Sequence, residues 1–256
     1  MIESERIKLA ELARRLAVEA GDKIMPLYRQ DIAVQQKPDA SPVTEADELA
    51  DEYIVAGLMQ GAPGIPVVSE ESVAQGRLPD ISGGLFWLVD PLDGTKEFIS
   101  GSNEFTVNIA LIENGTPVLG ALHAPALDDC YLTDGSTAFL IKRDGSKTQI
   151  SARAVPPEGA VVVASRHHRD AQTDTFIAEH HTASVTSAGS ALKFGLLARG
   201  AADIYPRFGR TMEWDTAAGH AVLSAAGGSV RRTDGNPLEY GKSSLDNPHF
   251  IARGQE

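Results

Sequence analysis

The feature that most constrains the fold is an apolar segment that leads straight into acidic residues, Trp87-Leu-Val-Asp90-Pro-Leu-Asp93-Gly-Thr-Lys-Glu97. The run that begins at Leu85 and ends at Val89 is apolar throughout, which predicts a buried strand. Strand ends are where α/β proteins place ligand-binding groups. We therefore expect a buried sheet with two carboxylates at the end of one strand.

The first half of the chain predicts helices followed by an antiparallel sheet. Apolar residues recur at helical spacing over about residues 3–28, and Thr44 opens a second helix that ends at Gly61-Ala-Pro-Gly64. The polar stretch 35–42 between them is expected to be a loop. Short apolar or alternating segments predict strands at 66–68, 85–89, 105–112, 118–123, 130–133 and 138–141. Asn114-Gly115 is typical of a hairpin turn between two of them.

After about residue 150 the pattern changes to strands that alternate with helices. Strands are expected at 161–163, 184–187 and 202–205, and helices at 170–180, 190–199 and 215–226. Such alternation is typical of an α/β arrangement. We expect an α/β protein with two halves, residues 1–145 and 146–256.

Composition excludes several classes of protein. The formal net charge of −12 makes the chain a poor general binder of nucleic acid or anionic membrane. A single cysteine, Cys130, excludes an intrachain disulfide and a multi-cysteine metal site. No secretory signal or membrane-length apolar run is present, so we expect a soluble cytoplasmic protein with no stable membrane insertion.

Asp90 and Asp93 lie three residues apart in a turn shaped by Pro91 and Gly94. Carboxylate and carbonyl oxygens in such a turn suit Mg²⁺. Two unit charges 4 Å apart repel by about 4 kcal/mol at an effective dielectric of 20, so converging carboxylates favour a bound cation. The alternative is an ordinary surface turn, and the turn alone does not decide between the two.

Three further acidic positions lie at the ends of predicted elements. Glu70 and Glu71 follow a strand, while Asp215 and the pair Thr44 and Asp47 stand at helix starts. Each has a structural alternative: solvated glutamates, an N-cap at Asp215, and a capping box at Thr44. A helix start and a catalytic role are compatible, so these alternatives do not exclude function.

Together, Ser-Glu-Glu at 69–71, Asp-Pro-Leu-Asp-Gly-Thr at 90–95 and Trp-Asp-Thr-Ala-Ala-Gly at 214–219 resemble the inositol monophosphatase superfamily of Mg²⁺-dependent, lithium-sensitive phosphatases. Within it, Asp-Gly-Thr-Lys-Glu-Phe at 93–98, the stretch from Asn103-Glu104 to Ala110, and Tyr-Pro-Arg-Phe-Gly at 205–209 are most similar to the CysQ-type 3′(2′),5′-bisphosphate nucleotidases. The resemblance implies a layered α/β/α/β/α sandwich of the sugar-phosphatase type.

The resemblance also implies roles at the acidic positions. Each site would hold two or three Mg²⁺ ions through a set of oxygen ligands: Glu70, Asp90, the Leu92 carbonyl, Asp93 and Asp215. The resemblance also implies that Li⁺ or Ca²⁺ inhibits the enzyme. Glu70 and Thr95, the latter oriented by Asp47, would position the attacking water. Gly94 and Thr95 would present backbone N–H groups to the phosphate.

On the substrate side, the resemblance implies hydrolysis of the 3′-phosphate of adenosine 3′,5′-bisphosphate to AMP in sulfate assimilation, with 3′-phosphoadenylyl sulfate as a second substrate. Ser190, Lys193 and Arg207 would bind the phosphate that is not hydrolysed, and Lys96 marks the nucleotide subfamily. His168 would lie against the adenine, although His167 replaces the usual serine beside it. By pattern alone, Lys193 and Arg207 are equally typical of surface side chains.

Two other functions stay open. One is an inositol or other sugar-phosphate phosphatase with the same metal site. The other is a sensor that binds metal and nucleotide without turnover. The expected partner is a small phosphorylated nucleotide. A homodimer and contact with the inner face of a membrane are left open by the sequence.

Overall fold

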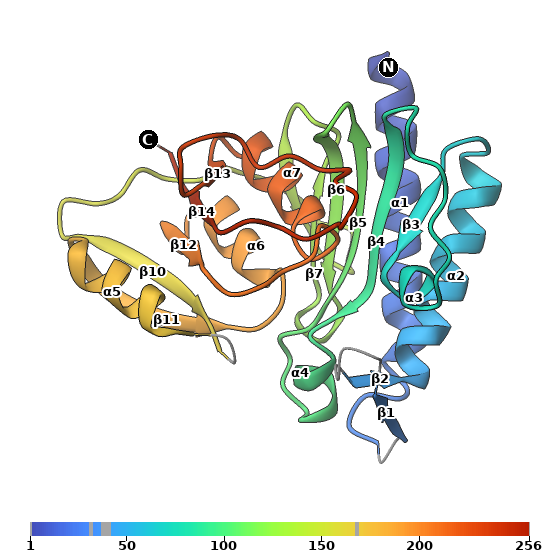
Figure 1. The fold of residues 1–256 in the computed structure, drawn as a ribbon, viewed down its shortest axis with the longest axis horizontal. Helices are drawn as coiled ribbons and strands as arrows, with labels where there is room; N and C mark the ends of the chain where they lie inside the picture. The colour runs from blue at the N-terminus through green and yellow to red at the C-terminus, as the bar shows by residue number, and fades with distance from the viewer. Residues whose placement is uncertain (1, 31–32, 37–41, 167–168, 256) are drawn as a thin grey trace.

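Two sheets organise the protein, and helices fill the space on and between them. The computed structural model describes residues 2–30, 33–36, 42–166 and 169–255. From one side to the other the layers run helix, sheet, helix, sheet, helix (Figure 1). This order confirms the predicted layered α/β fold.

The larger sheet has seven strands in the order of the chain. They are β3 (Val67–Ser69), β4 (Leu85–Asp93), β5 (Thr106–Glu113), β6 (Thr116–Ala124), β7 (Asp129–Thr133), β8 (Ala138–Ile141) and β9 (Lys147–Ile150). All neighbouring pairs are antiparallel except β3 and β4, which are parallel. Asn114 and Gly115 both have positive φ, 50° and 78°, in the predicted hairpin turn between β5 and β6.

The smaller sheet has five strands in the order β11-β10-β12-β14-β13. Their bounds are β10 (Ala160–Ser165), β11 (Thr182–Ala188), β12 (Ile204–Arg207), β13 (Ser229–Arg232) and β14 (Phe250–Arg253). The three strands β10, β11 and β12 are parallel, and the last two join in antiparallel fashion. Both β13 and β14 were missed by the sequence analysis because they are short and half exposed.

The helices form three layers. α1 (Glu3–Ile24) and α2 (Glu45–Gly61) cover one face of the larger sheet, α6 (Leu192–Ala198) and α7 (Ala217–Ala225) lie between the sheets, and α5 (Ala171–Glu179) packs outside the smaller one (Figure 1). Two short helices, α3 (Glu70–Ala74) and α4 (Thr95–Ile99), and a 3₁₀ turn, η1 (Pro125–Leu127), follow strand ends.

Strand β4 shows why the apolar run lacks an alternating pattern. Trp87 and Val89 pack against α1 and α2, whereas Phe86 and Leu88 belong to the core between the two sheets. Because both faces of this strand are covered, one by the helical layer of α2 and the other by the core between the sheets, both sets of side chains must be apolar. The buried strand therefore leads directly into the acidic residues at its end, and Asp90 is itself buried.

Three predicted boundaries are wrong. α1 ends at Ile24 rather than near residue 28, because Pro26 has no N–H with which to continue the helix. The stretch expected as a loop begins and ends in strands, β1 (Val34–Gln36) and β2 (Pro42–Thr44), which pair with each other. The last helix begins at Ala217, with Thr216 rather than Asp215 at its N-cap.

The predicted division after residue 145 falls just before β9, which pairs with β8 in the larger sheet. The chain passes to the smaller sheet between Ile150 and Ala160. α7, from the second half, packs on β5 and β6 of the first. One hydrophobic core thus spans both halves, and the division into residues 1–145 and 146–256 stays a prediction.

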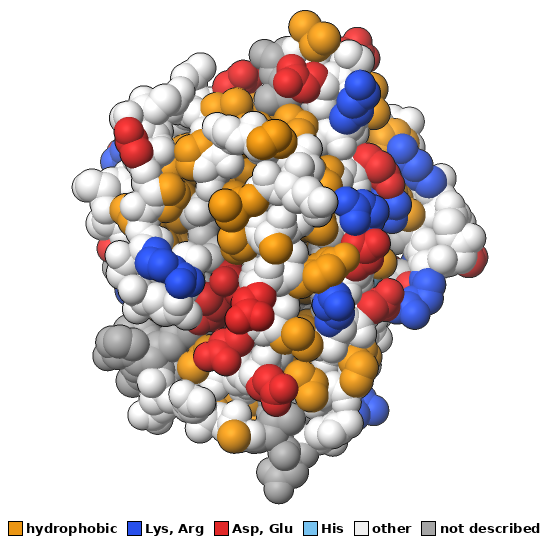
Figure 2. Space-filling view, turned by 90° about the vertical axis from the view of Figure 1, so that its right-hand side faces the viewer, with side chains coloured by type: hydrophobic (Ala, Val, Ile, Leu, Met, Phe, Trp, Pro, Cys, Tyr) orange, Lys and Arg blue, Asp and Glu red, His pale blue; other side chains and the backbone are white. Residues whose placement is uncertain are grey.

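The face that carries α2 mixes hydrophobic with charged side chains (Figure 2). Exposed Met59 and Leu78 belong to a largely apolar groove beside α2 and α3. Among the described helices, none combines the length and the apolar character that a membrane span needs.

Candidate active site

A cavity of about 260 Å³ opens where the two sheets meet at their strand ends. Its wall comes from both halves of the chain. The first half contributes residues at the ends of β3 and β4 and in α4, and the second contributes the turns before α6 and α7 and the end of β12. The predicted site residues in this wall are Glu70, Asp90, Leu92, Asp93, Gly94, Thr95, Lys96, Ser190, Lys193, Arg207 and Asp215.

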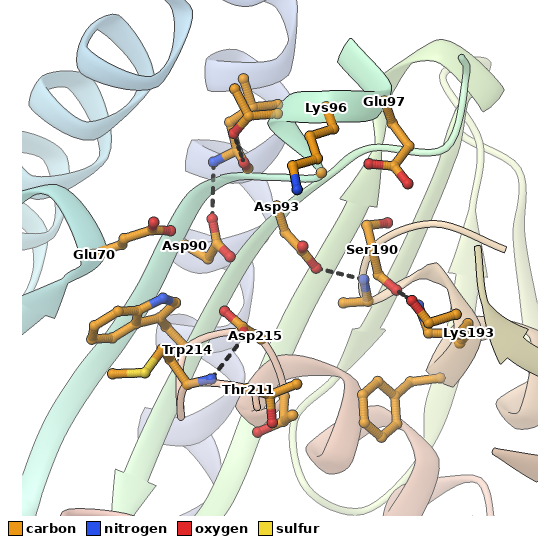
Figure 3. Close-up of a pocket in the computed structure, with 18 of the residues that line it drawn as sticks. Glu70, Asp90, Asp93, Lys96, Glu97, Ser190, Lys193, Thr211, Trp214 and Asp215 are labelled. Carbon is orange, nitrogen blue, oxygen red and sulfur yellow. Dashed lines mark hydrogen bonds between the residues drawn. The ribbon is translucent and has the colours of Figure 1, made fainter. Parts of the chain in front are cut away.

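One end of the cavity is acidic. Glu70 is the first residue of α3, directly after β3, and Asp90 and Asp93 lie at the end of β4. Asp215 reaches the same space from the turn before α7, and the four acidic side chains lie around this end of the cavity (Figure 3). The parallel pairing of β3 and β4 explains part of this convergence, because it brings both strand ends to the same edge.

The Asp90 turn is held by its own side chain. The Leu92 N–H donates to Asp90 Oδ1 at 3.1 Å, and the β-ladder to β5 is irregular between Asp90 and Asp93. Asp90 and Leu92 both line the cavity at this irregular end of the strand. Asp90 is almost completely buried, at 1% exposure, so its charge needs compensation.

Asp93 and Asp215 carry raised pKa values for a common reason. Burial raises the pKa of Asp93 to about 6, against the lowering effect of Lys193. Burial, and then the neighbouring charges of Asp93 and Glu70, raise the pKa of Asp215 well above its ordinary value. Asp93 Oδ2 accepts a hydrogen bond from Ala191 N–H at 2.5 Å, and Asp215 Oδ2 accepts one from Met212 N–H at 2.8 Å. These bonds do not offset the effect of burial on the two pKa values.

This donor set fits a hard divalent cation. It consists of carboxylate oxygens and a backbone carbonyl, the ligands that Mg²⁺ prefers. Burial, and then the proximity of like charges, raise the pKa values of Asp93 and Asp215, and a bound cation would oppose both effects. Within the described ranges, no three His, Cys, Asp or Glu side chains are already arranged at metal-binding distance. The carboxyl groups would therefore have to move to close around an ion.

Asp47 links the start of α2 to the cavity. Its Oδ2 accepts hydrogen bonds from the Thr44 N–H and hydroxyl, both at 2.7 Å, which completes the capping box. Its Oδ1 accepts a hydrogen bond from Thr95 Oγ1 at 3.0 Å. The capping role and the site contact weighed in the sequence analysis are thus both present. The second acceptor near the Thr95 hydroxyl is the Leu92 carbonyl, at 3.3 Å.

Gly94 sets the direction of α4. Its φ of 92° lies in the left-handed region, and a Cβ there would meet the Glu104 carbonyl oxygen at 3.3 Å. Thr95 follows this turn in the cavity wall, and the exposed Lys96 lies beside Asp93 (Figure 3). Any larger residue at position 94 would strain this turn.

The opposite end of the cavity is basic. Lys193 is buried, and its Nζ donates to the Ser190 carbonyl and, at 3.2 Å, to the Ala188 carbonyl. Burial lowers the pKa of Lys193 to about 8, so the side chain stays a cation at neutral pH. Arg207 is also buried, donates to the Arg210 carbonyl at 2.9 Å, and keeps its Nε without a partner in the described structure. Neither side chain is a surface residue.

His168 lies outside the described residues. The cavity wall also includes Glu97, Arg210 and Thr211, to which the sequence analysis gave no role. Glu97 stands within a motif that could have suggested it, whereas Arg210 and Thr211 follow no local pattern. The structure also makes Asn247 a support of the Asp215 turn, which no pattern near position 247 indicates.

Known proteins similar to this chain share its length and fold. The chain is 45% identical, over 92% of its length and 96% of the relative's, to a protein of Escherichia coli K12 named 3′(2′),5′-bisphosphate nucleotidase CysQ. It is 44% identical to the protein of that name from Salmonella typhimurium, over 94% and 98% of the two chains.

Solved structures agree with the sequence relatives. CysQ from Bacteroides thetaiotaomicron superposes with a TM-score of 0.79 at 38% identity, covering 96% of this chain and 97% of that one. An inositol monophosphatase of Thermotoga maritima gives a TM-score of 0.76 at 25% identity, over 95% and 91%. The sequence profile of the inositol monophosphatase family matches residues 5–253. On this evidence, with a match that spans both sheets and every wall of the cavity, the chain belongs to the inositol monophosphatase family.

Proposed function

We propose that this chain is a 3′(2′),5′-bisphosphate nucleotidase that hydrolyses the 3′-phosphate of adenosine 3′,5′-bisphosphate to AMP and phosphate with Mg²⁺. One observation carries the proposal. A single cavity has converging carboxylates at one end and two buried cations, Lys193 and Arg207, at the other. A substrate with two phosphates matches such a cavity, because one phosphate reacts at the acidic end while the other is bound at the basic end.

At the acidic end, Glu70, Asp90, Asp93, Asp215 and the Leu92 carbonyl would hold the Mg²⁺ ions. When bound, the ions supply positive charge that polarises the attacking water and stabilises the leaving oxygen. The members of this donor set lie in one cavity wall, and their mutual repulsion favours a bound cation. We further propose that Li⁺ or Ca²⁺ inhibits by competing for the same oxygens.

Thr95 and Asp47 would orient the attacking water. The Thr95 hydroxyl has one proton, and the hydrogen bond to Asp47 Oδ1 at 3.0 Å uses it. A lone pair of the Thr95 oxygen is then free to accept a hydrogen bond from the water. Asp47 is almost fully buried, and its carboxylate would take the Thr95 proton as a proton of the water passes to the Thr95 oxygen. Glu70, on the facing wall, is the second group that would position this water.

At the basic end, Lys193, Arg207 and Ser190 would bind the phosphate that is retained. Both cations are pre-ordered by backbone carbonyls, so little side-chain entropy is lost when an anion binds. Gly94, Thr95 and Lys96 would contact the phosphate that reacts, with His168 against the base. We include 3′-phosphoadenylyl sulfate as a second substrate, because only its 5′ substituent differs.

The test is a change of substrate preference. Lys193→Met and Arg207→Met should each raise KM for adenosine 3′,5′-bisphosphate about tenfold or more, because each removes a charge-assisted contact. Hydrolysis of inositol 1-phosphate, which has no second phosphate, should change little. Lys8→Met, at an exposed position on α1, is the matched control and should leave both activities unchanged. An unchanged preference in both variants would favour a sugar-phosphate phosphatase instead.

The Glu70→Gln variant distinguishes the proposed enzyme from a non-catalytic sensor. This variant should lose turnover while it still binds the nucleotide, because Lys193 and Arg207 are untouched. Phosphate release measures turnover, and calorimetry with the nucleotide measures binding. A wild-type protein that binds the nucleotide but releases no phosphate would instead support the sensor.

A further inference from the structure

Glu104 joins the two sheets beside the cavity. It lies between α4 and β5, and its carboxylate accepts two hydrogen bonds from Arg166 Nη2, at 2.9 and 2.8 Å. It accepts a third from the Gly189 N–H at 2.7 Å. A residue of the first half thus binds two residues of the second through three hydrogen bonds.

Both partners of Glu104 stand at strand ends. In the parallel pair β10 and β11, Ser165 faces Ala188 as the last pair in register. Arg166 and Gly189 are the next residues on these two strands. Glu104 therefore fixes both strands where their ladder ends, and Figure 1 shows these ends facing α4.

The backbone of Glu104 is packed as closely as its side chain. A Cβ on Gly189 would meet the Glu104 carbonyl oxygen at 2.7 Å, and one on Gly94 would meet the same oxygen at 3.3 Å. Two glycines, one from each half, therefore enclose this carbonyl. So close a fit transmits the position of Glu104 to the Gly189 turn.

The segments that Glu104 holds carry the basic end of the cavity. Ser165 and Ser190 line the cavity, and each is next in sequence to a partner of Glu104. The Lys193 ammonium donates to the carbonyls of Ala188 and Ser190, so this turn also sets its position. The Ala191 N–H is bound to Asp93, which anchors the turn at the acidic end even without Glu104.

We propose that Glu104 is a positioning residue that determines selectivity for nucleotides. Through Arg166 and Gly189 it holds the part of the cavity that would contact the retained phosphate and the nucleoside. The acidic end has separate supports, in Asp47 and Met212. Loss of Glu104 should therefore weaken nucleotide binding without changing the chemical step. This inference rests on the proposed function.

The experiment compares Glu104→Gln and Glu104→Ala with the wild type on two substrates. We expect KM for adenosine 3′,5′-bisphosphate to rise about tenfold in Glu104→Ala and less in Glu104→Gln, which keeps an oxygen for the Gly189 N–H. The kcat for the nucleotide, and kcat/KM for inositol 1-phosphate, should stay within about twofold of the wild type. Calorimetry should show a parallel loss of affinity for the product AMP.

Asp174→Asn is the matched control, since Asp174 accepts a hydrogen bond from Arg169 within the second half and neither residue lines the cavity. This variant should leave KM and kcat unchanged for both substrates. A double-mutant cycle with Arg166→Met tests the link, because two residues that act through one contact give non-additive effects on KM. Thermal melts establish that each variant is folded.

The outcomes separate this inference from the proposed function. A wild type that prefers inositol 1-phosphate overturns both. The second outcome is a wild type that prefers the nucleotide, with Glu104 variants that lose activity on both substrates equally or on neither. This outcome supports the proposed function and overturns the role of Glu104. A selective rise in nucleotide KM with unchanged kcat supports the inference.

Discussion

At the scale of single residues, Asp47 performs two tasks with its two oxygens. One oxygen caps α2 through Thr44, and the other binds the Thr95 hydroxyl. The cap anchors the carboxylate to the start of a 17-residue helix, so its direction toward Thr95 is fixed. The hydroxyl of Thr95 in turn cannot rotate freely, which prepares it to orient water.

Removal of that hydroxyl tests its role. Thr95→Val keeps the shape of the side chain and should lower kcat for the nucleotide about 10²-fold or more, as loss of a proton-transfer group does. KM should change little, because Thr95 Oγ1 is not among the groups proposed to bind the retained phosphate. Steady-state phosphate release measures both constants.

Thr95→Ser is the control for this change, since it restores the hydroxyl and should recover most of kcat. If Thr95→Val retained wild-type kcat, the water would have to be oriented by other groups. The assignment of Thr95 and Asp47 would then be wrong.

At the scale of elements, the turn before α7 is held by a residue far away in the sequence. Asn247 Nδ2 donates to the Met212 carbonyl at 2.7 Å and to Thr216 Oγ1 at 3.0 Å. The Asn247 N–H donates to the Thr211 carbonyl at 2.9 Å. These bonds brace both sides of Asp215.

Asn247→Asp should therefore weaken Mg²⁺ binding. The change replaces a donor with a carboxylate that faces the Met212 carbonyl, at a cost of about 1–3 kcal/mol. Loosening of the turn should raise the Mg²⁺ concentration for half-maximal activity several-fold and lower Tm. Asn236→Asp, on an exposed turn, is the control. An Asn247→Asp enzyme with wild-type Mg²⁺ dependence would show that Asp215 needs no such brace.

Local patterns were enough to predict the elements that frame the site. The run before Asp90, the Asn114-Gly115 turn and the Thr44 start of α2 each have a nearby physical signal, and the structure has all three. Contacts between distant segments have no such signal. The bonds from Ala191 to Asp93 and from Asn247 to Met212 join residues 98 and 35 positions apart. No periodicity in one sequence specifies them.

The short strands β9, β13 and β14 were not predicted for a related reason. Each has four residues and exposed or half-exposed positions, so its pairing partner rather than its composition makes it a strand. Knowledge of the family supplied what local patterns did not, namely the layered order and the joining of both halves around one cavity.

At the scale of the whole molecule, the acidic groups that the reaction needs lower the stability of the folded protein. Four acidic side chains converge where the halves meet, and Lys193 offsets only part of their charge. Mg²⁺ should therefore raise Tm, since a ligand that binds only the folded state stabilises it by about 2.7 kcal/mol at 100 times its Kd.

Asp215→Asn makes this prediction specific. Without Mg²⁺ the variant should be more stable than the wild type, because one repelling charge is gone. Its Tm should also rise less than that of the wild type when Mg²⁺ is added. Asp234→Asn, at an exposed turn, should respond as the wild type does. Equal Mg²⁺ shifts in Asp215→Asn and wild type would contradict the proposed ligand set.

Two buried histidines make stability depend on pH. Burial lowers the pKa of His123 and of His220 to about 4 each, below the ordinary value near 6.5. The unfolded chain then binds protons more readily than the folded one, so these groups favour unfolding as pH falls from about 6.5 to 4. Each histidine lowers the free energy of unfolding by at most about 3 kcal/mol at pH 4.

The raised pKa values of Asp93 and Asp215 act with the opposite sign, because protonation as pH falls removes a buried charge and also relieves their repulsion. Comparison with a variant separates the two effects. In urea unfolding at pH 7 and pH 4.5, His123→Gln with His220→Gln should lose less stability on acidification than the wild type. An equal loss in both proteins would mean that these histidines are not buried in the neutral form.

The most direct test of the central claim is phosphate release with Mg²⁺ from adenosine 3′,5′-bisphosphate and from inositol 1-phosphate under identical conditions. A cavity with an acidic reaction end and buried Lys193 and Arg207 predicts a kcat/KM for the nucleotide at least 10²-fold higher, roughly the combined worth of two charged contacts at about tenfold each. Equal values, or a preference for the inositol ester, would contradict the account.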